Sequence, residues 1–341
     1  MNRRLGLLAL LLLPGFVACG AVPIKPITSF KPEQLPSIRQ SGGTASTFDT
    51  GDGIKLRYAR FGAMQMEPVG TVVLVTGRTQ FIEVYLETIH SFRKRGFEVW
   101  AMDWRGQGLS GGRLADPHKG HIDSFDRYIA DLHHFRTRVV KPVGAHKILV
   151  SQSMGGGISL RYLVQHHGQF DKAILGAPLV DLAAPGWLVS FVAWQGESSP
   201  HDYVPGEGGG YGQHLRDFQG NPYTLDKRRF LRTHAYIDRD KRLALGAPTK
   251  GWIRAARDHC DKLGKHAFAS KLRTPVLIFA ASVDKLVDNE AQKKFADSAT
   301  TVRRIVLPET LHEIWLGRDR DQKRIWREVD AFLGAQIRRG L

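Results

Sequence analysis

The residues with the clearest chemical potential are those around Ser153. The segment 151–157, SQSMGGG, directly follows the apolar run at 147–150 and precedes a helical pattern. A serine in such a strand-to-helix turn has a strained backbone and needs small neighbours, and Gly155 meets that need. The usual pattern is Gly-x-Ser-x-Gly, and Ser151 stands where the first glycine is expected. We therefore predict that Ser153 is a nucleophile, with an ordinary glycine-rich turn as the alternative.

A serine hydroxyl is a weak nucleophile at neutral pH, so it needs a histidine as general base and a carboxylate that orients the imidazole. Around a serine in this kind of turn, the acid and then the histidine follow along the chain. Of the fourteen histidines, His312 is the one that follows the last strand-like run and leads into the closing helix. Asp284 comes first after the apolar run 276–281 and is the predicted acid, because a residue near a strand end is held rigidly. Asp288 is the rival.

Acyl transfer also needs two backbone N–H donors for the anionic oxygen of the tetrahedral intermediate. Met154 follows the predicted nucleophile and is the first candidate. The second should come from the loop after an early strand, where Gly77 permits close approach and Arg78 offers its N–H group. An ordinary strand-ending turn is the alternative there.

The segments that would position these residues alternate between strand and helix patterns. Short runs of Val, Ile and Leu, typical of strands buried on both faces, lie at 71–75, 98–102, 147–150, 172–175, 276–280 and 304–307. Helical patterns lie at 125–138, 158–166 and 321–339. This order predicts an α/β fold with a mostly parallel, doubly wound sheet. The segment 103–110 is predicted to brace the carboxyl edge of that sheet.

The strand rhythm stops from about residue 179 to 270, where helical patterns, a glycine-rich loop and many aromatic residues occur. We predict a helical cap inserted into one domain over 48–341, because the strands on either side carry parts of one predicted site. In the cap, Trp187 and Phe191 share a helical face that could line an acyl channel or dip into a membrane, with core packing as the alternative. Trp252 is a further candidate for the substrate pocket.

Several segments are similar to a known family. TGRTQFIEVY, MDWRGQGLSGG, SQSMGGG, ASVDKLVDN and LHEI resemble, in this order, the lysophospholipase and monoacylglycerol-lipase branch of the α/β hydrolases. That family also includes proteins named serine aminopeptidases. The segments at 221–224, 229–230 and 243–252 look like the bacterial lysophospholipase L2-type subgroup. The chain departs from the monoacylglycerol lipases at Thr76, where they have histidine.

The resemblance covers about residue 48 to the end, and it implies an α/β-hydrolase fold with a helical cap. It assigns the triad to Ser153, Asp284 and His312, and the oxyanion hole to the N–H groups of Arg78 and Met154. No metal or organic cofactor is implied.

The first 19 residues combine two arginines, a short leucine-rich run and small residues, which is typical of an export signal. The apolar run is about half of the roughly 20 residues that a membrane-spanning helix needs. The end of this segment resembles a bacterial lipoprotein cleavage box, so we expect lipidation of Cys19, with ordinary cleavage near Ala21 as the rival. Residues 20–47 are expected to tether the domain to a bacterial membrane, on the side that faces the periplasm. Without the lipid, the protein would be periplasmic or secreted.

The net charge of +16 is concentrated in residues 224–273, which hold 14 Lys or Arg against 5 Asp. No nucleic-acid-binding signature accompanies this excess, so nucleic acid is not an expected partner. Attraction to anionic lipid head groups suits an exported protein, and a solvated helical face is the alternative.

Together these features predict a serine ester hydrolase that acts on a single-chain lipid, a lysophospholipid or a monoacylglycerol, through an acyl-enzyme on Ser153. One alternative is a carboxylesterase of small non-lipid esters. Another is an aminopeptidase or amidase, which would need a carboxylate in the cap to hold a substrate amino group, whereas the cap is strongly basic. A non-catalytic lipid-binding protein is the third, but a binding role gives no reason to retain three triad residues.

Overall fold

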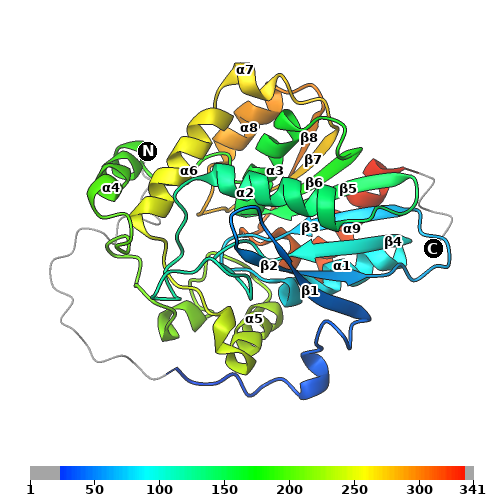
Figure 1. The fold of residues 1–341 in the computed structure, drawn as a ribbon, viewed down its shortest axis with the longest axis horizontal. Helices are drawn as coiled ribbons and strands as arrows, with labels where there is room; N and C mark the ends of the chain where they lie inside the picture. Colours follow the sequence, from blue (N-terminus) through cyan, green and yellow to red (C-terminus); the bar gives the residue numbers. More distant parts are fainter. Residues whose placement is uncertain (1–23, 335–341) are drawn as a thin grey trace.

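Eight strands form the central sheet of the computed structural model, which describes residues 24–334 (Figure 1). Across the sheet they follow the order β1-β2-β4-β3-β5-β6-β7-β8. The pairs from β4 to β8 are parallel, whereas β1 pairs with β2 and β2 with β4 in antiparallel fashion. This arrangement confirms the predicted α/β class with a mostly parallel sheet. The strands are β1 (Gly43–Asp49), β2 (Lys55–Phe61), β3 (Gly70–Val75), β4 (Phe97–Met102), β5 (His146–Gln152), β6 (Lys172–Gly176), β7 (Val276–Ala281) and β8 (Val302–Leu307).

Six of these strands coincide with the apolar runs of the sequence. Five of them lie inside the sheet, where strands are covered on both faces, whereas β8 lies at the edge and buries only Leu307. Every residue of β3, β4 and β7 is buried. The other two, β1 and β2, were not predicted. Most residues of β1 are exposed, and β2 mixes buried and exposed positions, so neither strand has a continuous apolar run.

Helices cover both faces of the sheet (Figure 1). On one face α1 packs against α9, where Arg95 Nε donates to Asp330 Oδ1 at 2.5 Å. On the other face α2 packs beside α3, and α8 lies farther along the sheet. These helices are α1 (Leu86–Lys94), α2 (Phe125–His134), α3 (Ser153–Gln165), α8 (Asn289–Asp297) and α9 (Asp319–Leu333).

Four helices lie between β6 and β7 in the chain and form the predicted cap (Figure 1). In this cap α4 and α6 approach closely, since a Cβ on Gly196 would lie 2.7 Å from the carbonyl oxygen of Lys250. No helix within residues 24–334 combines the length and the apolar character that crossing a membrane requires. The cap helices are α4 (Gly186–Ser198), α5 (Lys227–Arg239), α6 (Lys250–Leu263) and α7 (His266–Ala269).

The amino-terminal boundary of the domain differs from the prediction. β1 begins at Gly43, and Leu35 and Ile38 before it are buried. The described part of the expected tether therefore belongs to the folded domain, because its apolar side chains pack onto the core. The predicted signal peptide and Cys19 lie outside the described residues.

The segment after β4 braces the carboxyl edge of the sheet, as the sequence predicts. The buried carboxylate of Asp103 accepts a hydrogen bond from Arg57 Nε at 2.6 Å. Next to it, Trp104 Nε1 donates to the carbonyl oxygen of Thr76 at 2.8 Å. These bonds fix the loop that follows β3.

Some of the basic residues in the cap form buried ion pairs instead of facing solvent. Arg229 of α5 is buried and pairs with Glu87 at 2.7 Å, Asp226 at 2.7 Å and Asp319 at 2.8 Å. Since Glu87 belongs to α1 and Asp319 begins α9, this guanidinium joins the cap to the helices of the sheet.

Candidate active site

Ser153 lies in a strained turn between β5 and α3. Its φ of +53° falls in the left-handed region, which non-glycine residues rarely occupy. A Cβ on Gly155 would overlap the carbonyl oxygen of Thr76, and a Cβ on Gly157 would overlap that of Leu179. The close approach of neighbouring backbone therefore requires glycine at both positions, and the motif predicts this for Gly155.

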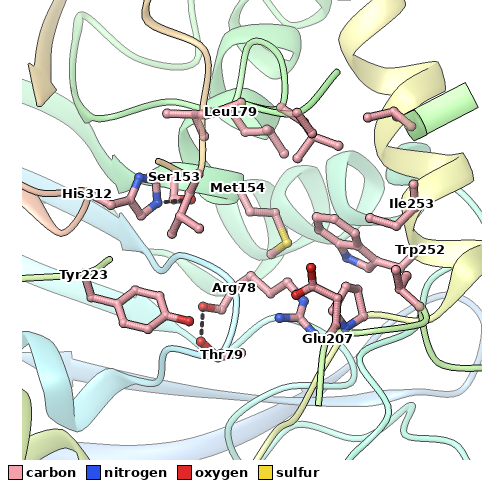
Figure 2. A pocket seen from close by; sticks show the side chains of 18 of the residues that line it. Arg78, Thr79, Ser153, Met154, Leu179, Glu207, Tyr223, Trp252, Ile253 and His312 are labelled. Carbon is pink, nitrogen blue, oxygen red and sulfur yellow. Dashed lines mark hydrogen bonds between the residues drawn. The ribbon is translucent and has the colours of Figure 1, made fainter. Parts of the chain in front are cut away.

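The structure brings Ser153, His312 and Asp284 together from three separate loops. His312 Nε2 lies 2.7 Å from Ser153 Oγ, and His312 Nδ1 lies 2.8 Å from Asp284 Oδ2 (Figure 2 shows the first contact). The His312 loop follows β8 and is held by Gln152, whose Nε2 donates to the His312 carbonyl oxygen at 2.8 Å. Both side chains of the His–Asp pair are buried.

The two candidate acids have different environments. Asp284 Oδ1 accepts hydrogen bonds from the N–H groups of Leu286 at 2.9 Å and Val287 at 3.1 Å, while Oδ2 faces the imidazole. Asp288 instead caps the first turn of α8, where its Oδ1 accepts from the N–H of Glu290 at 2.7 Å. The carboxylate that meets the imidazole is therefore that of Asp284.

The charges around the imidazole shift two pKa values. Burial lowers the pKa of His312, but the adjacent Asp284 carboxylate outweighs burial, so the pKa lies above its usual 6.5. Burial raises the pKa of the neighbouring Glu313 to about 7, against the attraction of His312. Sequence reasoning did not single out Glu313, since its position after His312 was the only signal.

The predicted oxyanion donors flank the serine. Met154 is the second residue of α3, and backbone N–H groups in the first turn of a helix have no intrahelical partner. A Cβ on Gly77 would lie 3.4 Å from the Ser153 Cβ, so the loop after β3 runs close to the serine. In that loop the Thr79 N–H donates to Gln107, whereas within residues 24–334 the Arg78 N–H donates to no protein group. The N–H groups of Met154 and Arg78 are thus open to a ligand.

A cavity with mostly apolar walls opens beside Ser153 (Figure 2). Its apolar lining comes from the strand ends and from the cap, and includes Leu179, Leu182, Val189, Val192, Trp252 and Ile253. Such a cavity suits an acyl chain, since each buried methylene group contributes about 0.8 kcal/mol to binding.

The predicted pocket residues separate into two groups. Trp252 lines the cavity and is buried. Trp187 and Phe191 are 67% and 49% exposed and are not among the lining residues, so the prediction that they contact substrate in the pocket does not match the structure. The opposite side of α4, with Val189 and Val192, faces the cavity instead, because the helix packs one face inward.

A second cavity adjoins the first and shares a polar wall with it. The shared residues include Arg78, Thr79, Glu207, Tyr223 and Glu313. Glu207 comes from the glycine-rich loop of the cap, in which no sequence pattern marks a site residue. Within the described part of the chain, no group of three or more His, Cys, Asp or Glu side chains could hold a metal ion.

A mostly parallel sheet that holds a serine in a strained strand-to-helix turn, with an acid and a histidine after later strands, characterises the α/β-hydrolase class. The chain has this architecture. A family model described as "Serine aminopeptidase, S33" matches residues 66–319, and the chain belongs to this family.

Relatives agree with this assignment, and a solved structure agrees with the fold. The chain is 30% identical over 279 residues to lysophospholipase L2 of Escherichia coli K12, which covers 79% of this chain and 81% of the relative. It is 26% identical over 295 residues to the probable lysophospholipase L2 of Haemophilus influenzae, and this match covers 83% of this chain and 90% of the relative. A monoglyceride lipase structure from Saccharomyces cerevisiae superposes with a TM-score of 0.68 at 18% identity and covers 88% of this chain and 97% of that one.

Proposed function

We propose that this protein is a serine hydrolase that cleaves the carboxylic ester of a single-chain lipid, a lysophospholipid or a monoacylglycerol. The observation that carries the proposal is the contact series from Ser153 Oγ through His312 to Asp284, at 2.7 Å and 2.8 Å, beside an apolar cavity. The likeness to lysophospholipase L2 of Escherichia coli and to the probable lysophospholipase L2 of Haemophilus influenzae favours a lysophospholipid.

In the first half of the reaction, His312 Nε2 takes the proton of the Ser153 hydroxyl as Oγ attacks the ester carbonyl carbon. The carbonyl oxygen becomes anionic and accepts hydrogen bonds from the Met154 and Arg78 N–H groups. The carbon–oxygen bond to the alcohol then breaks, and the alcohol leaves with the proton from His312. The acyl group stays on Ser153 as an ester.

In the second half, His312 takes a proton from a water molecule that attacks the acyl-enzyme. The fatty acid leaves, and the proton returns to Ser153 Oγ. Throughout, the Asp284 carboxylate keeps the proton on His312 Nδ1, so that Nε2 faces the serine as an acceptor.

The test is a panel of p-nitrophenyl esters, a lysophospholipid, a monoacylglycerol and an aminoacyl amide, assayed with the purified protein and with Ser153→Ala. We expect ester hydrolysis by the wild type and its loss in the variant. Equal ester hydrolysis by the two proteins would refute the mechanism.

An aminopeptidase or amidase is the second candidate function. The observation that favours it is Glu207, because this carboxylate is contributed by the cap and lines the cavity beside Ser153. The aminoacyl amide arm of the panel tests this candidate, which predicts a higher kcat/KM for the aminoacyl amide than for the lysophospholipid and the monoacylglycerol.

For cellular location, we propose export, lipidation of Cys19 and contact with a membrane surface. The export pattern in the sequence and the exposed aromatic side chains of α4, Trp187, Phe191 and Trp194, support this proposal. The mass of the mature amino terminus tests lipidation, and a mature protein that begins unmodified at Ala21 would contradict it. Cosedimentation with phosphatidylglycerol vesicles tests surface contact.

A further inference from the structure

Three charged side chains line the polar wall between the two cavities: Arg78, Glu207 and Glu313. In Figure 2, Arg78 and Glu207 lie with Tyr223 and Thr79 along one side of the pocket, across from Leu179. The acyl cavity therefore has one polar side, close to Ser153. A ligand that binds here would have to supply hydrogen-bond and charge partners for these groups.

The Arg78 guanidinium lacks the partners that other buried guanidinium groups of this protein have. Its one hydrogen bond runs from Nη2 to the carbonyl oxygen of Gly246 at 2.6 Å, and its buried Nε has no partner. Among the described residues it forms no ion pair, whereas Arg57 and Arg229 pair with carboxylates. A planar guanidinium with free N–H groups in a cavity is suited to bind a phosphate.

The two carboxylates are also incompletely satisfied. Glu313 is 3% exposed, and its Oε1 accepts one long hydrogen bond of 3.3 Å from Gln80 Nε2. Its Oε2 is buried without a partner. Within residues 24–334, Glu207 forms no hydrogen bond through its carboxylate and no ion pair. Glu207 is partly buried, whereas burying the Glu313 carboxylate without full pairing is costly, so a cationic ligand would relieve this cost.

We propose that Arg78, Glu207 and Glu313 form a head-group site for a zwitterionic substrate, in which Arg78 binds a phosphodiester and the two carboxylates bind a primary ammonium group. This inference rests on the proposed ester hydrolysis. It makes the enzyme selective for a lysophospholipid with an aminoethyl head group.

The position of Arg78 explains how one substrate reaches both sites. Its backbone N–H is a proposed oxyanion donor, and its side chain extends along the polar wall toward Gly246 of the cap. The acyl chain then lies in the apolar cavity, the scissile carbonyl lies at Ser153, and the head group lies along the polar wall. A monoacylglycerol would fill the apolar part and leave the charged groups without partners.

The charge balance of the wall supports the ammonium assignment. Ionised Glu313 lies beside Asp284 and forms no ion pair within residues 24–334, and burial raises its pKa to about 7 against the attraction of His312. Glu207 likewise has a raised pKa because of burial, despite the attraction of Arg78. A ligand with one phosphate and one ammonium group supplies a counter-charge to each side of the wall without adding net charge.

The experiment compares three substrates with the same acyl chain in the same detergent: lysophosphatidylethanolamine, lysophosphatidylglycerol and monoacylglycerol. The first has the phosphate and the ammonium group, the second only the phosphate, and the third neither. The readout is the ratio of kcat/KM values between substrates, measured for the wild type, Glu207→Gln, Arg78→Met and Arg78→Lys. Glu197→Gln is the matched control, because Glu197 is an exposed carboxylate of the cap that does not line either cavity.

We expect Glu207→Gln to lower the ratio of lysophosphatidylethanolamine to lysophosphatidylglycerol about tenfold, since a charged hydrogen bond is lost. Arg78→Met should lower the preference for both phospholipids over monoacylglycerol by about tenfold or more, and Arg78→Lys should restore part of it. Glu197→Gln should leave both ratios unchanged. Because ratios are compared, a general loss of active protein does not imitate the effect.

The inference is overturned if the wild type hydrolyses monoacylglycerol as efficiently as lysophosphatidylethanolamine, or if Glu207→Gln leaves the phospholipid ratio at the wild-type value. A preference for an aminoacyl amide over all three lipids would also overturn it, since the carboxylates would then bind a peptide amine. In contrast, ester hydrolysis that persists in Ser153→Ala would remove the proposed function itself. The two failures are therefore distinguishable.

Discussion

The substitution Asp284→Asn is expected to abolish most activity through the tautomer of His312. Oδ1 of Asp284 accepts two backbone N–H groups, from Leu286 and Val287, at 2.9 Å and 3.1 Å. An asparagine would keep its carbonyl oxygen on these donors and turn its NH₂ group toward His312 Nδ1. The imidazole must then accept at Nδ1 and carry its proton on Nε2, which faces Ser153 Oγ at 2.7 Å. In that tautomer it is no base for the serine.

The magnitude follows from the same geometry. In serine proteases with the equivalent substitution, kcat falls about 10⁴-fold with the site geometry intact, which corresponds to about 5.5 kcal/mol of transition-state stabilisation. We expect a loss of this order in kcat/KM for a p-nitrophenyl ester at pH 8, with little change in the thermal unfolding temperature, because the substitution preserves size and the two backbone hydrogen bonds.

Asp288→Asn is the matched control, since it makes the same change in the same loop. Asp288 caps α8, and asparagine caps helices about as well as aspartate, so activity and stability should stay near the wild-type values. A tenfold or smaller loss in Asp284→Asn, or an equal loss in Asp288→Asn, would refute the assignment of the acid.

Three further predictions concern pH and stability. The acid limb of kcat/KM should have its midpoint above pH 6.5, because Asp284 raises the pKa of His312, and it should move to lower pH in Asp284→Asn; a midpoint that stays in place would contradict this cause. Glu313 has a folded-state pKa of about 7 against its usual 4.5, so the wild type should lose up to about 3 kcal/mol of stability as pH rises from 4.5 to 7. A glutamine at this position does not titrate, so Glu313→Gln should raise the free energy of unfolding, relative to the wild type, more at pH 8 than at pH 5 in urea unfolding. Equal changes at both pH values would contradict the raised pKa of Glu313. Arg57→Met should cost about 3–5 kcal/mol in the same assay, because it leaves the fully buried Asp103 carboxylate without its cation. The exposed ion pair between Arg242 and Asp240 provides the control, and Arg242→Met should leave the free energy of unfolding unchanged.

The strands at the centre of the sheet and the serine turn could be predicted from the sequence because their signals are local. A strand covered on both faces is apolar at every position, as in β3 and β7. The turn at Ser153 needs a small residue at Gly155 for steric reasons that chains with this turn share. The choice of Asp284 over Asp288 also followed from a local cue, the distance from the strand end.

Other features left no such signal. β1 is mostly exposed, so its pairing with β2 depends on backbone hydrogen bonds that no apolar pattern reports. The spacing of the aromatic residues in α4 predicts one face of a helix, but a sequence does not say which face turns inward. Packing against α6 put Val189 on the cavity side and Trp187 in solvent.

What the sequence determined by itself is the chemistry along the chain: a nucleophile in a strained turn, an acid and a histidine after later strands, and an interrupted strand rhythm that marks a cap. What only the tertiary structure decided is the shape and charge of the space around the nucleophile. Arg78, Glu207 and Glu313 come from three distant segments and share no motif. They form one polar wall because the cap folds back over the edge of the sheet, and contacts between distant segments are set by packing rather than by local pattern.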